Sequence, residues 1–133
     1  MATVKRVFIA FAVEDKKYRD FLVGHARHPK SPFEFIDMSV KEPWDEQWKT
    51  RCRSRVKGCD GVIALISKNT AAASGELWEI KCAYEENVPT MLMWINDERP
   101  AVPSLIKDKR INIWSWDNLE SFIDKLESFI DKL

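Results

Sequence analysis

Hydrophobic residues along the chain fall into five short runs, which longer and mostly polar stretches separate. Three of the runs are apolar almost throughout, and two alternate between apolar and polar positions. Continuous apolar runs of this length are typical of strands buried on both faces. Alternation between apolar and polar residues is typical of a strand with one face exposed to solvent. The five predicted strands are 7–11, 33–37, 61–67, 90–95 and 111–116.

The stretches between these runs carry apolar residues three or four positions apart. This spacing predicts helices that pack one face against a sheet. Asp15 is placed to cap the first helix and Ser74 to cap the third, because both side chains can accept hydrogen bonds from a first helical turn. The predicted helices are 16–26, 44–57, 74–87 and 117–133.

Strands that alternate with helices predict an α/β fold, in which right-handed crossovers join parallel strands and helices cover both faces. We predict a flavodoxin-like, doubly wound sheet of five parallel strands in the order 2-1-3-4-5, with three layers, formed by a single domain over residues 1–133. Ligands of such sheets bind outside the carboxyl ends of the strands, beside strands one and three. The segments expected at that edge are 11–15, Asp37 with the residues after it, and 67–79.

The third predicted helix carries the candidate chemistry. Glu76 and Glu79 fall in its first two turns, where the positive end of the helix dipole favours carboxylates. Gly75 lies four residues before Glu79, beneath its side chain, and is expected to leave an open pocket beside that carboxylate. From spacing alone, Glu79 is either a site residue or an ordinary solvated glutamate of a first turn.

Composition argues against several classes of function. The chain has 21 basic and 21 acidic residues, so it lacks the basic excess of a nucleic-acid-binding protein. Cys52, Cys59 and Cys82 are odd in number without CxxC spacing, and neither His25 nor His28 has a cysteine near it. We therefore expect neither a disulfide framework nor a bound metal. No apolar run reaches the roughly 18 residues that span a membrane, and no signal sequence is evident, so we expect a cytoplasmic protein.

The last predicted helix contains a repeat of seven residues. Leu-Glu-Ser-Phe-Ile-Asp-Lys occupies 119–125 and occurs again at 126–132. Such a repeat keeps its apolar residues on one face of a helix. One interpretation is a helix that closes the fold against the sheet and is lengthened by duplication. The other is that the second copy, for which no sheet is left to cover, pairs with a second chain.

Two segments resemble a known family. Val7-Phe8-Ile9-Ala10-Phe11, followed by Glu14-Asp15, resembles the opening box of Toll/interleukin-1 receptor (TIR) domains. Residues 74–83, with Trp78-Glu79-Ile80 among them, resemble the helix that carries the catalytic glutamate of NAD-cleaving TIR domains. The likeness is greatest to the bacterial TIR-like group that includes the sensor of the Thoeris antiphage system. It covers residues 5–117, and it departs from the pattern at two places: Ala10 replaces the usual serine, and Gly75 stands where many TIR enzymes carry tryptophan.

The resemblance implies an enzyme that cleaves NAD, releases nicotinamide and makes a cyclic ADP-ribose-type signal in bacterial antiphage defence. It implies that Glu79 is catalytic and that no cofactor is bound, because NAD is the substrate. For Asp37 the alternative is a cap of the following loop, and for Trp78 a place in the core. The expected partners are NAD and a separate effector protein that reads the product, with neither nucleic acid nor a membrane. The substrate-binding residues expected beside Glu79 are Phe11, Ala12, Asp37, Ser74 and Trp78.

Other functions are compatible with the predicted topology. One is a non-catalytic TIR-like module that assembles with itself, through TIR surfaces such as the loop 38–46 or through the C-terminal helix. A phosphoaccepting receiver needs an aspartate at the end of the third strand, where this chain has Ser67-Lys68. A dinucleotide-binding Rossmann domain is disfavoured, because no GxGxxG motif follows any predicted strand.

Overall fold

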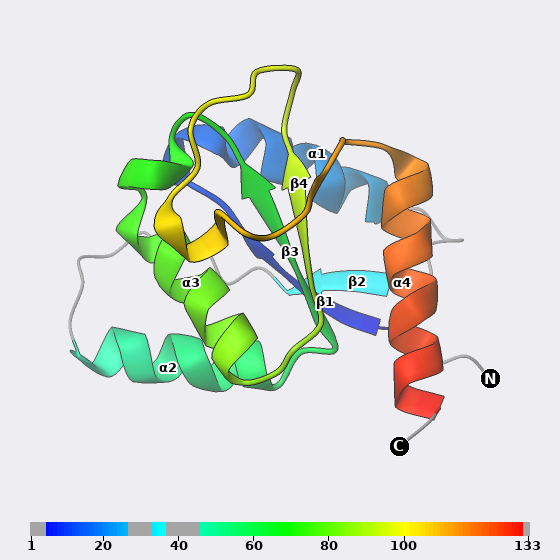
Figure 1. The fold of residues 1–133 in the computed structure, drawn as a ribbon. Helices are drawn as coiled ribbons and strands as arrows, with labels where there is room; N and C mark the ends of the chain where they lie inside the picture. Colours follow the sequence, from blue (N-terminus) through cyan, green and yellow to red (C-terminus); the bar gives the residue numbers. More distant parts are fainter. Residues whose placement is uncertain (1–4, 27–32, 37–45, 132–133) are drawn as a thin grey trace.

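Helices and strands alternate along the chain in a computed structural model that describes residues 5–26, 33–36 and 46–131 (Figure 1). The strands are β1 (Lys5–Ala10), β2 (Phe33–Ile36), β3 (Gly61–Ile66), β4 (Thr90–Trp94) and β5 (Ile111–Asn112). The α-helices are α1 (Lys16–Ala26), α2 (Glu46–Lys57), α3 (Ser74–Glu85) and α4 (Trp116–Asp131), and the short 3-10 helices are η1 (Val13–Asp15), η2 (Thr70–Ala72) and η3 (Ser104–Ile106).

The five strands form one sheet in the order β2-β1-β3-β4-β5, and all neighbouring pairs are parallel. The predicted strand order is therefore confirmed. The central strand β3 is buried along its whole length, as a strand covered on both faces must be.

Side chains of β3 alternate between two separate hydrophobic cores. Val62, Ala64 and Ile66 face the core that α2 and α3 cover, whereas Ile63 and Leu65 face the core under α1 and α4. This alternation follows from the two-residue period of a strand. The helices thus lie in two layers with the sheet between them (Figure 1).

The fifth strand is shorter than its pattern predicts. The expected strand 111–116 ends at Asn112, and α4 already begins at Trp116. Ser115 explains the early end, because its hydroxyl accepts a hydrogen bond from the Asn118 amide at 3.0 Å and so caps α4. Trp114 does not continue the strand; its ring contacts those of Tyr18 and Phe21 on α1.

The described part of the repeated segment, 119–131, lies in one continuous helix that packs on the sheet. Leu119 from the first copy and Leu126 from the second are each only 1% exposed. Gly61 makes room for this contact, because a Cβ atom at that position would lie 2.7 Å from one methyl group of Leu126. The expectation that the second copy has no sheet to cover is therefore wrong at its first residue.

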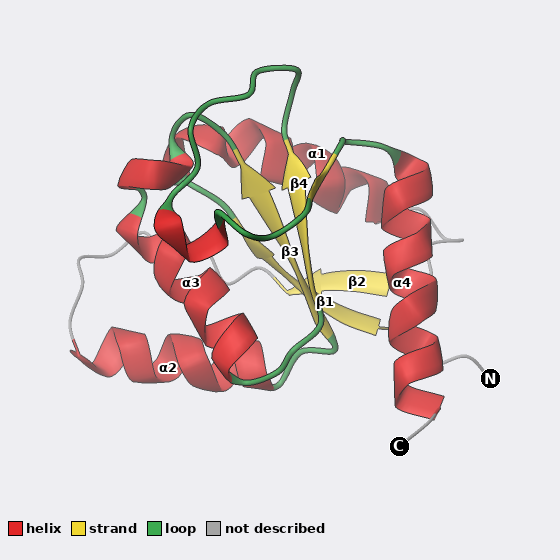
Figure 2. Ribbon diagram, viewed as in Figure 1, coloured by secondary structure: helices red, strands yellow, loops and turns green. Residues whose placement is uncertain are grey.

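The loops that follow the strands gather at the carboxyl edge of the sheet (Figure 2). The loops after β1 and β3 are neighbours there, because β1 and β3 pair in the middle of the sheet.

Asp37 and the start of the predicted second helix, 44–45, lie outside the described residues. Among the helices of the described part, none is long and apolar enough to cross a membrane.

We predict that Leu126→Ala lowers the free energy of unfolding by about 2–4 kcal/mol, as Leu119→Ala does, because each removes a fully buried leucine. Urea unfolding followed by circular dichroism measures both values. Glu120→Ala, at an exposed position of the same helix, is the control and should change stability by less than about 0.5 kcal/mol. If the Leu126→Ala protein were as stable as the control, the second copy of the repeat would not contribute to the core.

Candidate functional site

The buried carboxylate of Asp15 joins the loops that follow β1 and β3. Asp15 is 3% exposed and ends η1. It accepts a hydrogen bond from the Ser67 hydroxyl at 2.5 Å and another from the Asn69 side-chain amide at 2.9 Å. The described contacts of this carboxylate thus go to the β3 loop and not to the first turn of α1. The predicted role of Asp15 as a helix cap is therefore wrong.

Further hydrogen bonds fix the shape of the loop between β3 and α3. The Ser67 amide donates to the Thr70 hydroxyl at 2.9 Å, and the Asn69 amide donates to the Ser67 hydroxyl at the same distance. Thr70 is completely buried. Since these bonds are short-range and internal, the loop presents the start of α3 at a defined place on the carboxyl edge of the sheet.

The first turn of α3 lacks the cap that the sequence predicts. The position before the helix is Ala73, and it has no side-chain cap. Ser74 is instead the first helical residue and is exposed. The prediction placed the cap one residue late, because the small residues 71–73 give no sign in the sequence of where the loop ends.

Two glutamates of α3 are buried. Glu76 is 2% exposed and Glu79 is 7% exposed. Burial raises the pKa of both carboxyls well above the ordinary value, because a charged carboxylate loses its hydration there. Glu79 is therefore not the solvated first-turn glutamate of the alternative interpretation.

Glu76 lacks the hydrogen bonds that a buried carboxyl usually makes. Among the described residues, neither of its oxygens has a hydrogen-bond partner of ordinary geometry. The nearby Thr70 hydroxyl lowers the pKa of Glu76 somewhat, but burial outweighs it, and the negative charges of Glu79 and Asp15 raise the pKa further. The pKa of Glu76 therefore depends on the charges of both Asp15 and Glu79.

Glu79 interacts electrostatically with a thiol of the neighbouring helix α2. Burial raises the pKa of the Cys52 thiol of α2 to about 12, and the negative charge of Glu79 contributes to this rise. Cys52, Cys59 and Cys82 are free and buried. In the described part of the chain, no three histidine, cysteine or acidic side chains are placed to hold a metal ion together.

The residues expected around Glu79 lie in different surroundings. Ala12 is buried in the β1 loop, and the half-buried Phe11 ring packs in the core on the α1 side, 5.4 Å below the Arg19 guanidinium. Ser74 and Trp78 together line a pocket of about 600 Å³ on α3. Asp37 lies outside the described residues. The joint role of these side chains in binding a substrate stays a prediction, as does the pocket expected over Gly75.

Comparison with known proteins agrees with this geometry. Residues 8–100 match a family model described as the TIR-like domain of the Thoeris protein ThsB. The chain belongs to this family. The matched residues include the second half of β1 and the whole of η1, β3 and α3, the elements that carry Asp15, Glu76 and Glu79.

Among solved structures, the ThsB-type domain is similar to the crystal structure of the TIR domain of the Toll-related receptor TRR-2 from Hydra magnipapillata. The TM-score is 0.58, and the match covers 94% of this chain and 97% of the receptor domain at 14% identity. At this identity the likeness shows a TIR fold and no more. No curated protein matches the chain.

Sequence reasoning did not single out Glu76 or the bonds of Asp15. A signal for Glu76 is present, because it precedes Glu79 by three residues and so shares a helix face with it. The hydrogen-bond partners of Asp15 could not be predicted from the local sequence, because Ser67 and Asn69 are 52 and 54 residues away from it. Only the pairing of β1 with β3 brings them together.

We predict that Ser67→Ala lowers the free energy of unfolding by about 1–3 kcal/mol, because one buried oxygen of Asp15 loses its donor. Thermal or urea unfolding measures the change. Ser121→Ala, at an exposed position of α4, is the matched control and should be nearly neutral. Equal stability of the two variants would show that the link between the β1 and β3 loops contributes little.

A second prediction concerns the pH dependence of stability. Above pH 4.5, the ordinary pKa of glutamate, the unfolded chain releases a proton that folded Glu76 keeps, so the free energy of unfolding falls as pH rises. Glu76→Gln has no proton to release at this position. The variant should therefore gain stability over the parent as pH rises from 5 to 8, by up to about 1.4 kcal/mol per pH unit.

Urea unfolding at several pH values measures this difference. Glu120→Gln, an exposed substitution of the same kind on α4, should leave the pH dependence of the parent unchanged. A difference between Glu76→Gln and the parent that stays constant with pH would mean that Glu76 is already ionised in the folded protein.

Proposed function

We propose that this domain cleaves NAD, releases nicotinamide and makes a cyclic ADP-ribose-type signal in bacterial antiphage defence. The observation that carries the proposal is the burial of Glu79, a carboxyl of α3 within the part of the chain that matches the ThsB TIR-like family. Ionisable groups with strongly shifted pKa values are common at catalytic sites.

The reaction needs few protein groups. The nicotinamide of NAD is already a cation, so the bond between its ring nitrogen and the ribose C1′ breaks without a general acid, and the bonding electrons pass to the ring nitrogen. The ribose is left with an oxocarbenium-like positive charge. An ionised Glu79 in a site of low polarity would stabilise that charge strongly, because solvent screens it poorly there. Attack by water would then give a linear product, and attack by a nucleophile of the same molecule a cyclic one.

The raised pKa of Glu79 has a role in this scheme. Desolvation makes the ionised carboxylate costly in the free protein. A cationic nicotinamide bound beside it offsets this cost, so substrate binding and ionisation of Glu79 favour each other. As nicotinamide leaves, the positive charge moves to the ribose, which then stabilises the ionised Glu79 in place of nicotinamide. The carboxylate therefore stabilises the transition state of the reaction.

The other partners belong to the same proposal. A separate effector protein would read the product, and the domain would assemble through TIR surfaces. The described part of α4 gives no support to assembly through this helix, because Leu119 and Leu126 are already buried on the sheet.

We predict that Glu79→Gln lowers the rate of nicotinamide release at least about 100-fold, because the amide cannot carry the stabilising charge. Chromatography of an incubation with NAD measures nicotinamide and the nucleotide product together. Circular dichroism should show an unchanged fold, because glutamine has nearly the same shape. Glu120→Gln on the exposed face of α4 should turn over NAD like the parent.

Two results would contradict the assignment. If Glu79→Gln released nicotinamide as fast as the parent, Glu79 would not be the catalytic residue. If Glu76→Gln were inactive while Glu79→Gln kept full activity, the second buried carboxyl of α3 would take its place.

A further inference from the structure

A groove runs between α2 and α3 on the outside of the molecule. It consists of two adjoining pockets of about 600 Å³ and 360 Å³, which share Lys49 and Trp78 as lining residues. The larger pocket also has apolar walls from Leu77 and from Leu105 of η3. Cavities of this size are typical of small-molecule sites.

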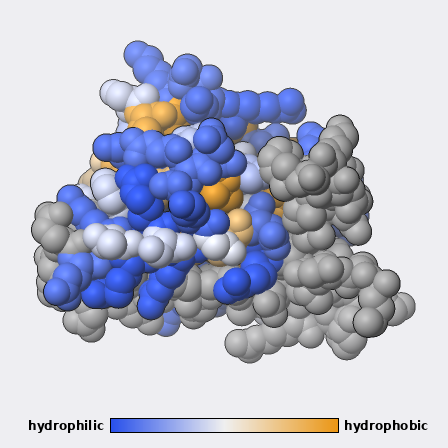
Figure 3. Space-filling model, turned by 90° about the horizontal axis from the view of Figure 1, so that it is seen from below, coloured by the Kyte–Doolittle hydropathy of each residue, from blue (hydrophilic) through white to orange (hydrophobic). Residues whose placement is uncertain are grey.

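Basic side chains dominate the lining of the groove. Lys49, Arg53 and Lys57 lie four residues apart on α2, and Lys81 stands opposite them on α3. The single acidic residue of the two linings is Glu86. Figure 3 views the molecule from below Figure 1, the side on which α2 lies, and the described residues there are mostly hydrophilic with hydrophobic ones exposed between them. This local positive charge stands out on a chain whose net charge is zero.

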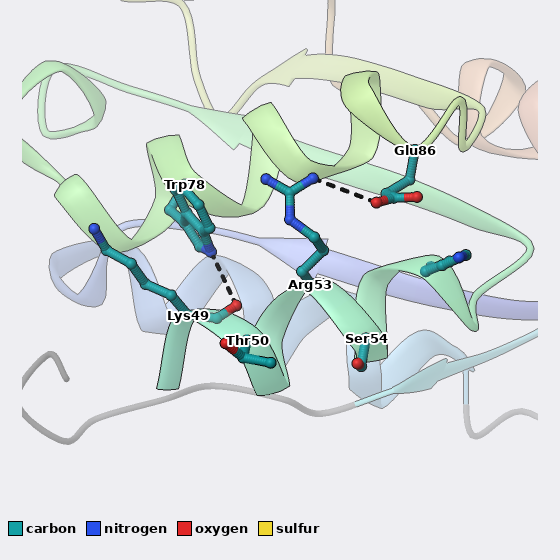
Figure 4. A pocket seen from close by; sticks show the side chains of 7 residues that line it. Lys49, Thr50, Arg53, Ser54, Trp78 and Glu86 are labelled. Carbon is teal, nitrogen blue, oxygen red and sulfur yellow. Dashed lines mark hydrogen bonds and ion pairs between the residues drawn. The ribbon is translucent and has the colours of Figure 1, made fainter. Parts of the chain in front are cut away.

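Trp78 gathers these cations around one aromatic ring. The charged groups of Lys49 and Arg53 each lie 5.1 Å from the ring centre, and that of Lys81 lies 5.6 Å from it. The indole N–H donates to the Lys49 carbonyl at 3.4 Å, which fixes the ring between the two helices (Figure 4). Such cation–π contacts contribute only about 0.5–1 kcal/mol each at an exposed site.

Among the described residues, two glutamates at the end of α3 and just after it bind one of the groove's cations. Glu85 and Glu86 both bind the Arg53 guanidinium, at 2.7 Å and 3.3 Å. Lys57 and Lys81 are exposed on opposite sides of the groove. A phosphate group would offer them charge-assisted hydrogen bonds, which are stronger than contacts with an aromatic ring.

We propose that this groove binds a nucleotide, a ligand with both a phosphate group and an aromatic base, at a site separate from Glu79. The basic side chains of α2 and α3 would bind the phosphate, and the base would lie against Trp78, Leu77 and Leu105. Trp78 and Glu79 are neighbours in sequence but point about 100° apart around α3. Glu79 is also absent from the linings of both pockets. The site therefore does not rest on the proposed reaction, and it assigns Ser74 and Trp78 to this groove in place of the role expected for them beside Glu79.

Calorimetric titration of the full chain with AMP tests the proposal. AMP should bind saturably and less tightly as salt rises. Adenosine carries only the base of the recognised ligand and inorganic phosphate only its phosphate, so each should bind at least about tenfold more weakly. The double variant Lys57→Ala, Lys81→Ala should weaken AMP binding at least about fivefold. The matched control is Lys16→Ala, Lys125→Ala, which removes two exposed lysines from other helices and should bind like the parent.

Two further variants separate the groove from the NAD site. Trp78→Phe keeps an aromatic ring and should retain most AMP binding, whereas Trp78→Ala should lose it; circular dichroism checks that both fold. Glu79→Gln should bind AMP like the parent even though it is expected to lose NAD cleavage. The proposal is wrong if AMP shows no saturable binding, or if the Lys57→Ala, Lys81→Ala protein binds it like the parent. It is also wrong if inorganic phosphate or adenosine alone binds as tightly as AMP, or if Glu79→Gln abolishes binding.

Discussion

The hydrogen bonds of Asp15 hold together the edge of the sheet at which chemistry is expected. β1 and β3 are paired in the sheet, but their loops leave in different directions, toward α1 and toward α3. A buried carboxylate that binds both Ser67 and Asn69 prevents these loops from separating. Because α3 begins only a few residues after this link, the link also sets where the helix starts. The position of Glu79 thus depends on a contact made by another element.

The two buried carboxyls of α3 carry a cost in stability. Glu76 has no partner of ordinary geometry among the described residues, and Glu79 is nearly as deeply buried. Burying such groups without compensating hydrogen bonds opposes folding. The extensive apolar cores on both faces of the sheet allow the domain to fold despite this cost. Arrangements of this kind are typical of sites where a shifted pKa serves a reaction, and less so of residues that only stabilise a fold.

The sequence was sufficient for the fold because its signals there are local and strong. A short apolar run rich in β-branched residues, such as 61–66, favours a buried strand, and the alternation of strands with helices leaves few topologies. The sequence pattern misplaced element boundaries that depend on a single side chain. The alternating pattern continued past β5, although Ser115 already caps α4. The start of α3 was also misplaced, because Ala73 and not Ser74 precedes the helix. The surroundings of Glu79 were harder still, because they join residues far apart in the chain. The helix pattern also gave no hint that Trp78 faces the outer groove with α2 and not the β1 loop.

The duplicated segment of α4 determines how this end of the protein can change in length. Seven residues of α-helix advance about 10.5 Å and fall only about 20° short of two full turns. A whole extra copy therefore leaves every earlier leucine on the sheet, whereas an insertion of two residues would swing Leu126 away from Gly61. The helix runs from the carboxyl edge of the sheet toward the opposite edge (Figure 1). Further copies of the seven-residue repeat would lengthen α4 at the edge of the sheet opposite its carboxyl edge. They would not change the region of Asp15 and Glu79.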